Sequence, residues 1–189
     1  MWPWSHLAFG YLLVSLLWRL RAHRVDGAVA VTAAVGTQFP DLVDKPLAWA
    51  VGVLPAGRSL AHSVFTAAVV AAVVLYVARR WGQSDPALAF VVGYASHLAG
   101  DAIPKLPAGD FDSLTFLLWP VLPLPEYEGG EPVLANLADI AAAPAAYLLA
   151  SPGRLALLVV VFVVWSVDGF PGVPGVGRYL GRKTAGRPD

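Results

Sequence analysis

A histidine and an aspartate stand four positions apart in an apolar segment, residues 91–101 (Val-Val-Gly-Tyr-Ala-Ser-His-Leu-Ala-Gly-Asp). Residues four apart lie on the same face of a helix, so His97 and Asp101 can bind one object between them. Ionisable groups are costly in apolar surroundings and mark a candidate functional site. The alternative is a buried pair whose two members satisfy each other.

Further residues of ligand type lie in three other parts of the chain. His6 precedes the first apolar run, Asp41 and Asp44 lie between two prolines, and His62 lies in a short polar stretch. Imidazole nitrogens and carboxylate oxygens bind zinc and similar divalent ions. The chain has no cysteine, which excludes thiolate ligands and a cysteine nucleophile. The predicted metal ligands are His6, Asp41, His62, His97 and Asp101.

These ligands predict a divalent metal cofactor, zinc in the first place, with manganese and magnesium as alternatives. They suit one ion with a second shell, or two ions that share a carboxylate. A bound ion can activate water for hydrolysis, and Asp41 or Asp44 could orient that water. Arg58 could hold a phosphate through its planar fork. The predicted catalytic residues are Asp44 and Arg58.

Simpler interpretations exist for some of these residues. Asp44 can pair with its neighbour Lys45, and Arg58 can be an ordinary loop charge. A serine nucleophile beside a histidine, Ser63 or Ser96, is disfavoured because adjacent helical residues do not face each other and no Gly-x-Ser-x-Gly motif is present.

The composition indicates which elements must position these residues. The chain has 189 residues, of which 57% are hydrophobic and 14% charged, and its mean hydropathy is +0.62. Soluble domains average about 45–50% apolar and about 25% charged residues. We therefore predict an all-α, multi-pass transmembrane helical bundle in the cell membrane, with roughly four to six membrane segments.

The formal net charge is zero, so no nucleic acid is predicted as a partner. The oligomeric state stays open.

The apolar runs divide this domain, residues 1–168, into segments. The predicted helical segments are residues 7–18, 64–78, 87–103, 133–150 and 155–167. Pro40 and Pro46 predict an irregular acidic turn, and Asp85 is a candidate cap before the segment 87–103. Residues 104–131 are predicted to form an interfacial or re-entrant segment over the site, with a solvated acidic loop at 126–131. Residues 169–189 are predicted to be a flexible tail rich in Pro, Gly and Arg.

Basic clusters at residues 19–24 and 79–80 predict which helix ends are cytoplasmic. With those ends inside, the five ligands and Asp44 fall at the non-cytoplasmic face. A site at bilayer depth meets the lipid bilayer and amphiphiles first, which favours a lipid-like or phosphoester small-molecule substrate. Two other functions stay open: a proton- or metal-coupled transporter that uses His97 and Asp101 as a relay, and a non-catalytic scaffold with a structural metal.

The order and spacing of the motifs resemble a known family. Residues 39–46 (Phe-Pro-Asp-Leu-Val-Asp-Lys-Pro), 58–63 (Arg-Ser-Leu-Ala-His-Ser), 93–101 and 117–120 (Leu-Leu-Trp-Pro) look like the membrane-bound metal-dependent hydrolases, whose bacterial members include the LexA-regulated inner-membrane hydrolase. Where that family often has a histidine before the arginine, this chain has Gly57.

The resemblance implies a membrane-embedded hydrolase with a metal site. A looser similarity to the zinc-dependent phospholipase C and P1 nuclease group implies phosphoester cleavage. It also implies that His62, His97, Asp101 and an aspartate of the Pro-Asp segment bind one ion, while His6 shares Asp101 with a second.

Overall fold

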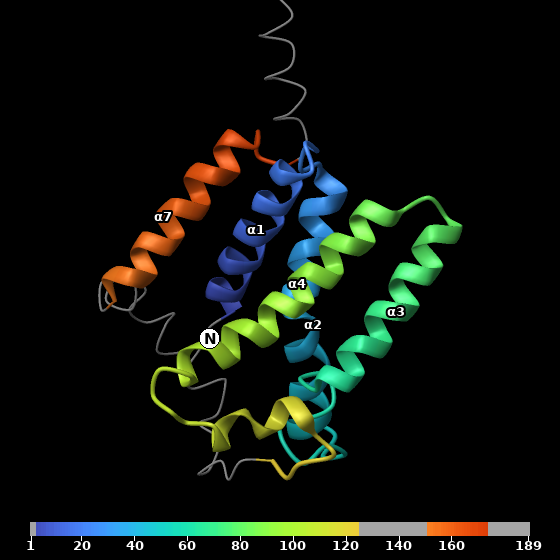
Figure 1. Ribbon diagram of the computed structural model, residues 1–189, viewed down its shortest axis with the longest axis vertical. Coiled ribbons are helices and arrows are strands. Elements are labelled where there is room, and N and C mark those ends of the chain that lie inside the picture. Colours follow the sequence, from blue (N-terminus) through green and yellow to red (C-terminus); the bar gives the residue numbers. More distant parts are fainter. Residues whose placement is uncertain (1–2, 125–150, 174–189) are drawn as a thin grey trace, which may run out of the picture.

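The computed structural model describes residues 3–124 and 151–173, and within these ranges the fold is entirely helical (Figure 1). This confirms the all-α prediction. The predicted segment 133–150, the acidic loop 126–131 and tail residues 174–189 lie outside the described residues. The helices are α1 (Pro3–Leu20), α2 (Gly27–Trp49), α3 (Val64–Arg80), α4 (Ser84–Ala102), the 3₁₀ helices η1 (Ile103–Lys105) and η2 (Asp112–Leu118), and α7 (Pro152–Val167).

Local signals in the sequence fix several helix ends. The side chain of Asp26 accepts a hydrogen bond from Val29 N at 2.8 Å and caps the start of α2. Ser63 Oγ accepts from Phe65 N at 3.2 Å and caps α3. The sequence predicted Asp85 as the cap of α4, and this is wrong. The helix begins at Ser84 with Gln83 as its N-cap, so Asp85 lies in the first turn. A carboxylate there still favours the helix through the helix dipole.

Helices α2 and α4 form the centre of the bundle and cross with their backbones in contact. A Cβ on Gly36 would overlap the carbonyl of Phe90, and a Cβ on Gly93 would overlap the carbonyl of Ala33. Helix α1 packs against both, α3 packs against α4, and α7 packs against α1. Small residues at this crossing are what let His97 on α4 approach α2.

Gly36→Ala should destabilise the protein by about 1–3 kcal/mol, because backbone rather than a flexible side chain occupies the space of the new methyl group. Thermal unfolding of the detergent-purified protein measures this change. Gly153→Ala in α7 is the matched control, since a Cβ there meets nothing within 4 Å. Equal unfolding temperatures for the two variants would contradict the close crossing.

The predicted irregular turn between Pro40 and Pro46 is wrong, because α2 continues through both prolines to Trp49. A proline inside a helix removes one hydrogen bond and loosens the preceding turn. Tertiary packing outweighs this cost here: Pro40 is buried, and the turn before it contributes a carbonyl to the candidate site. The helical path places Asp41 and Asp44 on neighbouring positions of one helix.

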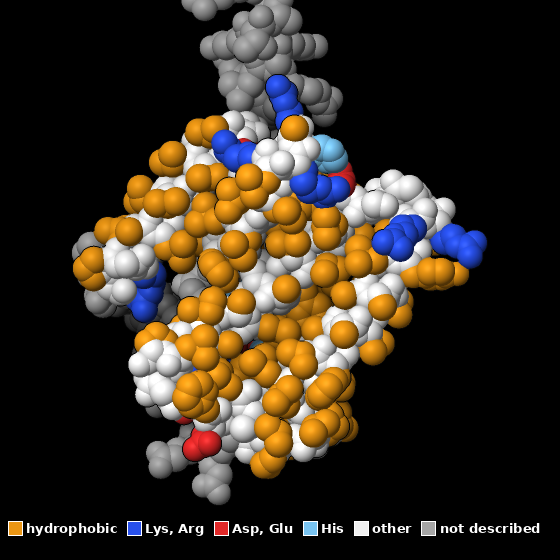
Figure 2. Space-filling model, in the orientation of Figure 1, with side chains coloured by type: hydrophobic (Ala, Val, Ile, Leu, Met, Phe, Trp, Pro, Cys, Tyr) orange, Lys and Arg blue, Asp and Glu red, His pale blue; other side chains and the backbone are white. Residues whose placement is uncertain are grey.

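The sides of the bundle carry many exposed apolar side chains (Figure 2). In the described ranges, however, no helix combines the length and the apolar character needed to cross a bilayer. Helices α3 and α7 have 17 and 16 residues, and the longer α2 and α4 include the polar residues of the candidate site. The described helices therefore do not provide the predicted four to six membrane segments.

Candidate metal centre

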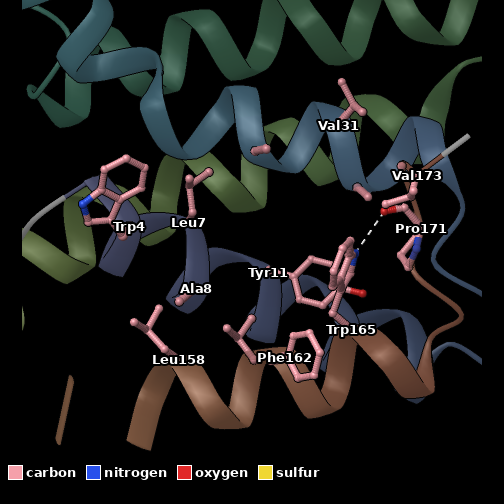
Figure 3. Close-up of a pocket in the computed structure, with 14 residues that line it drawn as sticks. Trp4, Leu7, Ala8, Tyr11, Val31, Leu158, Phe162, Trp165, Pro171 and Val173 are labelled. Atoms are coloured by element: carbon pink, nitrogen blue, oxygen red, sulfur yellow. Dashed lines mark hydrogen bonds between the residues drawn. The ribbon is translucent and has the colours of Figure 1, made fainter. Parts of the chain in front are cut away.

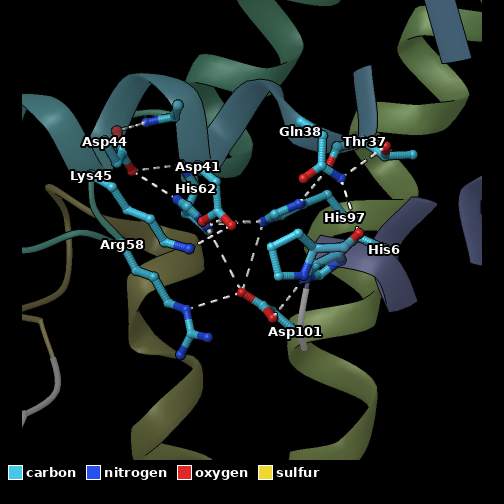
Figure 4. A network of polar contacts seen from close by, with 12 residues as sticks. His6, Thr37, Gln38, Asp41, Asp44, Lys45, Arg58, His62, His97 and Asp101 are labelled. Atoms are coloured by element: carbon cyan, nitrogen blue, oxygen red, sulfur yellow. Dashed lines mark hydrogen bonds and ion pairs between the residues drawn. The ribbon is translucent and has the colours of Figure 1, made fainter. Parts of the chain in front are cut away.

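Four separate segments bring the predicted metal ligands to one end of the bundle (Figure 4). We call His6, Asp41, His62, His97 and Asp101 the His/Asp cluster. They come from α1, from α2, from the loop before α3, and from α4. The three histidines are buried. All five predicted ligands, and both predicted catalytic residues, lie together.

The tautomer of His97 follows from its backbone partner. Its Nδ1 lies 2.6 Å from the carbonyl oxygen of Thr37. A carbonyl can only accept, so Nδ1 carries the hydrogen and Nε2 is left with a lone pair. That lone pair points into the His/Asp cluster, which is the orientation a metal ligand needs.

His62 is oriented in the same way by a carboxylate. Its Nδ1 lies 2.8 Å from Asp44 Oδ2, so Nδ1–H donates to the carboxylate and Nε2 is again an acceptor. The Nε2 atoms of His62 and His97 are only 3.1 Å apart. Two lone pairs at this distance repel each other unless a proton or a metal cation lies between them. The arrangement therefore calls for a cation.

Asp41 and Asp101 each place a carboxylate oxygen near the Nε2 atoms of His62 and His97. Asp41 Oδ1 lies 3.5 Å from His62 Nε2 and 3.9 Å from His97 Nε2. Asp101 Oδ2 lies 3.9 Å from each of these nitrogens. Donors around a tetrahedral zinc at about 2.0–2.1 Å stand about 3.3 Å apart. The separations within the group Asp41, His62 and His97 are 3.1–3.9 Å, near this edge length, so these three residues fit a divalent ion after small movements.

His6 gives a second grouping of ligand atoms. Its Nε2 lies 3.3 Å from Asp101 Oδ1, and its ring stacks on His97 with centroids 3.8 Å apart. Among the described residues, its buried Nδ1 finds no hydrogen-bond partner. Two ligand triads result, Asp41–His62–His97 and His6–His97–Asp101. Asp101 can thus serve either one ion or two.

The local charge also favours a cation. Three buried or nearly buried carboxylates, Asp41, Asp44 and Asp101, lie around the histidines, with Lys45 and Arg58 at their edge. Burial alone would lower the pKa of His62, but its hydrogen bonds to Asp41 and Asp44 outweigh burial and raise this pKa above its usual value. The carboxylates that raise the proton affinity of His62 also favour a metal ion beside it.

Asp44 is wholly buried and holds the His62 loop in place. Its oxygens accept hydrogen bonds from the backbone N–H groups of Ser59 and Ala61, each at 2.8 Å, besides that from His62 Nδ1. Tyr94 Oη donates to the Ala61 carbonyl at 2.5 Å and fixes the same loop from α4. With these partners Asp44 is a positioning residue. The geometry does not support its predicted role in orienting water.

Asp44→Asn is expected to lower metal affinity by roughly 10–100-fold, the usual effect of losing the carboxylate behind a metal-bound histidine. The amide has one acceptor fewer, so His62 Nδ1 or a loop N–H loses its partner. Isothermal titration with zinc measures the affinity. Asp110→Asn, at an exposed aspartate of the connection after η1, is the control and should bind zinc like wild type.

The remaining candidates have local roles. The hydroxyl of Ser63 caps α3, and that of Ser96 donates to the Gly93 carbonyl at 2.6 Å, so neither is poised as a nucleophile. Phe116 of η2 is buried with its ring centroid 6.1 Å from that of His62. Residues 112–118 thus cover the site in part, in line with the predicted covering segment.

Sequence reasoning missed Thr37 and Tyr94 as supports of the site. Thr37 contributes only its backbone oxygen, which no side-chain pattern reveals. Tyr94 lies three residues before His97, on the same helix face, and this spacing is the one signal that could have identified it.

A cavity separate from the residues of the His/Asp cluster lies between α1, α2 and α7 (Figure 3). Its volume is about 570 Å³, and its lining is almost entirely apolar. The polar groups on its wall are already engaged: Tyr11 Oη donates to Asp168 at 2.8 Å, and Trp165 Nε1 donates to the Pro171 carbonyl at 3.1 Å. This cavity offers contact to hydrocarbon rather than chemistry.

Comparison with known proteins gives one match. The family model described as YdjM inner membrane protein matches residues 1–171, which include every residue of the His/Asp cluster. No curated protein and no solved structure matches the chain.

Proposed function

Because the chain belongs to the YdjM inner membrane protein family, we propose that it is a metal-dependent hydrolase of the membrane that acts on phosphoesters of lipids or lipid-linked substrates. The observation that carries the proposal is the pair of Nε2 lone pairs on His62 and His97, 3.1 Å apart and flanked by two carboxylates. Such a set of acceptors needs a cation.

Each residue has a part in this proposal. His62, His97, Asp41 and Asp101 would hold a divalent ion, zinc in the first place, and His6 with Asp101 could hold a second. When bound, the ion supplies a Lewis acid and an activated water. Asp44 orients His62, and the Thr37 carbonyl orients His97.

Two features support a lipid-like substrate. The family is one of membrane proteins, and the cavity between α1, α2 and α7 has an almost entirely apolar lining, in which Tyr11 and Trp165 have hydrogen-bond partners. Arg19 and Arg79 lie at the C-terminal ends of α1 and α3, whereas His6 and His62 lie at or just before the N-terminal ends of these helices. Since basic helix ends prefer the cytoplasm, we place the site near the non-cytoplasmic face.

The transporter alternative needs polar groups that lead from the site to the opposite end of the bundle. The described core toward that end contains an apolar cluster that includes Val14, Trp18 and Val29. The scaffold alternative needs a metal with every coordination position closed. A partly exposed Asp41, Lys45 and Arg58 at the edge of the cluster favour an open position instead.

The test is hydrolysis of phosphoesters by the detergent-purified protein. Zinc-loaded protein is assayed against chromogenic phosphate monoesters and diesters and against phospholipids in mixed micelles, followed by release of chromophore or phosphate. We expect a chelator to abolish turnover and zinc to restore it. Tight zinc binding without turnover of any substrate in this panel would favour the scaffold.

A further inference from the structure

The entrance to the His/Asp cluster is bordered by two cations. The histidines and Asp44 have side-chain exposures of 0–1%, and Asp101 has 2%, whereas Asp41 has 12%, Lys45 28% and Arg58 36%. In the described part of the chain, the cluster therefore meets its surroundings where Lys45 and Arg58 lie. Any substrate group that reaches the cluster by this route passes these two side chains.

Each cation is tied to one carboxylate of the cluster. Lys45 Nζ lies 2.6 Å from Asp41 Oδ2, and Arg58 Nε lies 3.0 Å from Asp101 Oδ2. Arg58 uses Nε for this contact, and its two terminal nitrogens point away from Asp101 and the histidines (Figure 4). Those nitrogens form the planar fork that binds a phosphoryl group through two parallel hydrogen bonds.

The two cations come from different elements that are packed together. Lys45 is on α2, one turn after Asp41, and lies over the ring of Trp49 at 5.9 Å. Arg58 is in the loop that Asp44 holds. A Cβ on Gly57 would stand 2.8 Å from Trp49 Cζ2 and 3.4 Å from Lys45 Cγ, so the loop backbone lies directly against Lys45 and Trp49. Both charges are therefore held on one side of the cluster.

We propose that Lys45 and Arg58 together form the anion-binding part of the site and hold the phosphoryl oxygens of the substrate beside the metal centre. This inference rests on the proposed function. It adds Lys45, which the sequence suggested only as a neighbour of Asp44, as a residue that contacts substrate. The remaining N–H groups of the pair favour a tetrahedral oxyanion over a neutral ester, because hydrogen bonds between a cation and an anion are about twice as strong as hydrogen bonds between neutral groups.

Titration of the zinc-loaded, detergent-purified protein with inorganic phosphate tests the proposal. We expect Lys45→Met and Arg58→Met each to weaken phosphate binding about tenfold, the effect of losing one charge-assisted hydrogen bond. Arg58→Lys should recover only part of the affinity, since it keeps the charge and loses the fork. Lys105→Met, at a partly exposed lysine paired with Asp110, is the matched control and should bind phosphate like wild type.

Metal content and thermal unfolding are measured on every variant, and the titration is repeated on metal-free protein. Retained zinc with unchanged phosphate affinity in both variants overturns this proposal and leaves the metal centre standing. Wild-type protein that takes up no zinc overturns the proposed function, and the metal-free titration then decides the anion site by itself: no phosphate binding there also overturns it.

A last arm identifies where the anion comes from. Protein in phosphatidylcholine nanodiscs is titrated with and without phosphatidic acid in the bilayer. A weaker apparent affinity for phosphate with phosphatidic acid present identifies a lipid headgroup as the ligand, and an unchanged affinity identifies a free anion.

Discussion

Replacing His97 with alanine is expected to lower zinc affinity by at least about 100-fold, so that the purified protein retains only background metal. His97 belongs to both ligand triads, Asp41–His62–His97 and His6–His97–Asp101. Its loss therefore removes a donor from either arrangement of ions. Elemental mass spectrometry of the detergent-purified protein measures the metal content, and adding Asp101→Ala should remove what metal remains.

The expected loss must be separated from a loss of folding. His97 is wholly buried and bonded to the Thr37 carbonyl, so alanine leaves a cavity and an unpaired acceptor. His97→Gln retains a donor for Thr37 and most of the volume but not the imidazole ligand, and it should unfold closer to wild type while still losing metal. His23→Ala controls for histidine number, because His23 lies exposed beside Asp85 at the other end of the bundle.

The prediction fails if His97→Ala carries as much zinc as wild type after metal repletion. It also fails if wild type itself takes up none. In the second case the close Nε2 atoms of His62 and His97 would be explained by a shared proton. The transporter alternative would then be the one to test, with a proton-flux assay in vesicles.

The residues of the site could be identified from the sequence because their types are scarce. The chain has only four histidines, so the three that stand beside motif residues were informative. Helical spacing joined His97 to Asp101 without any structural knowledge. What joined His6 and His62 to them was the alternation of apolar runs, which brings every second helix end to the same side.

The roles within the site could not be predicted, because they depend on backbone groups. Asp41 and Asp44 are equivalent by type and spacing. Asp41 faces Nε2 of His62, whereas Asp44 accepts hydrogen bonds from the backbone N–H groups of residues 59 and 61. This distinction is set by the path of an irregular loop. The partner of Lys45, by contrast, was predictable from helical spacing, because Asp41 is four residues earlier on α2. The pairing was missed because the two prolines favoured the prediction of a turn instead of a helix.

The packing of α7 on α1 was not predicted, because the sequence showed the apolar run but not the helix it packs against. The wrong prediction of a turn at the two prolines also arose from tertiary packing that the local sequence does not show. Asp168 directly follows the apolar run, residues 155–167, and the sequence predicted no partner for it. In the structure it accepts hydrogen bonds from Tyr11 at 2.8 Å and Ser15 at 2.7 Å, and it pairs with Arg19 at 2.7 Å. These donors recur at four-residue spacing along one face of α1, which marks that face as the docking side for a carboxylate.

Asp168→Leu is accordingly expected to destabilise the protein by roughly 3 kcal/mol, because hydrogen bonds to a charged group contribute about 1.5–3 kcal/mol each and the two hydroxyls lose their acceptor together. The pair with Arg19 adds little, since the Arg19 side chain is 48% exposed. Hydrogen exchange should accelerate in α7 more than in α2, because α7 packs mainly on α1.

Tyr11→Phe and Ser15→Ala each remove a single donor and leave Asp168 its other partners, so each should cost about 1 kcal/mol. If the network acts as a unit, a variant that combines Tyr11→Phe, Ser15→Ala and Asp168→Leu will lose less stability than the sum of the losses in the three single variants. Strict additivity would show that the three contacts are independent. Unchanged exchange in α7 would show that the apolar contacts with α1 hold it alone. Zinc affinity should stay at the wild-type value in all these variants, because Asp168 lies at the end of the bundle opposite the His/Asp cluster. Measuring zinc affinity beside stability therefore separates the stability of the scaffold from the chemistry of the site.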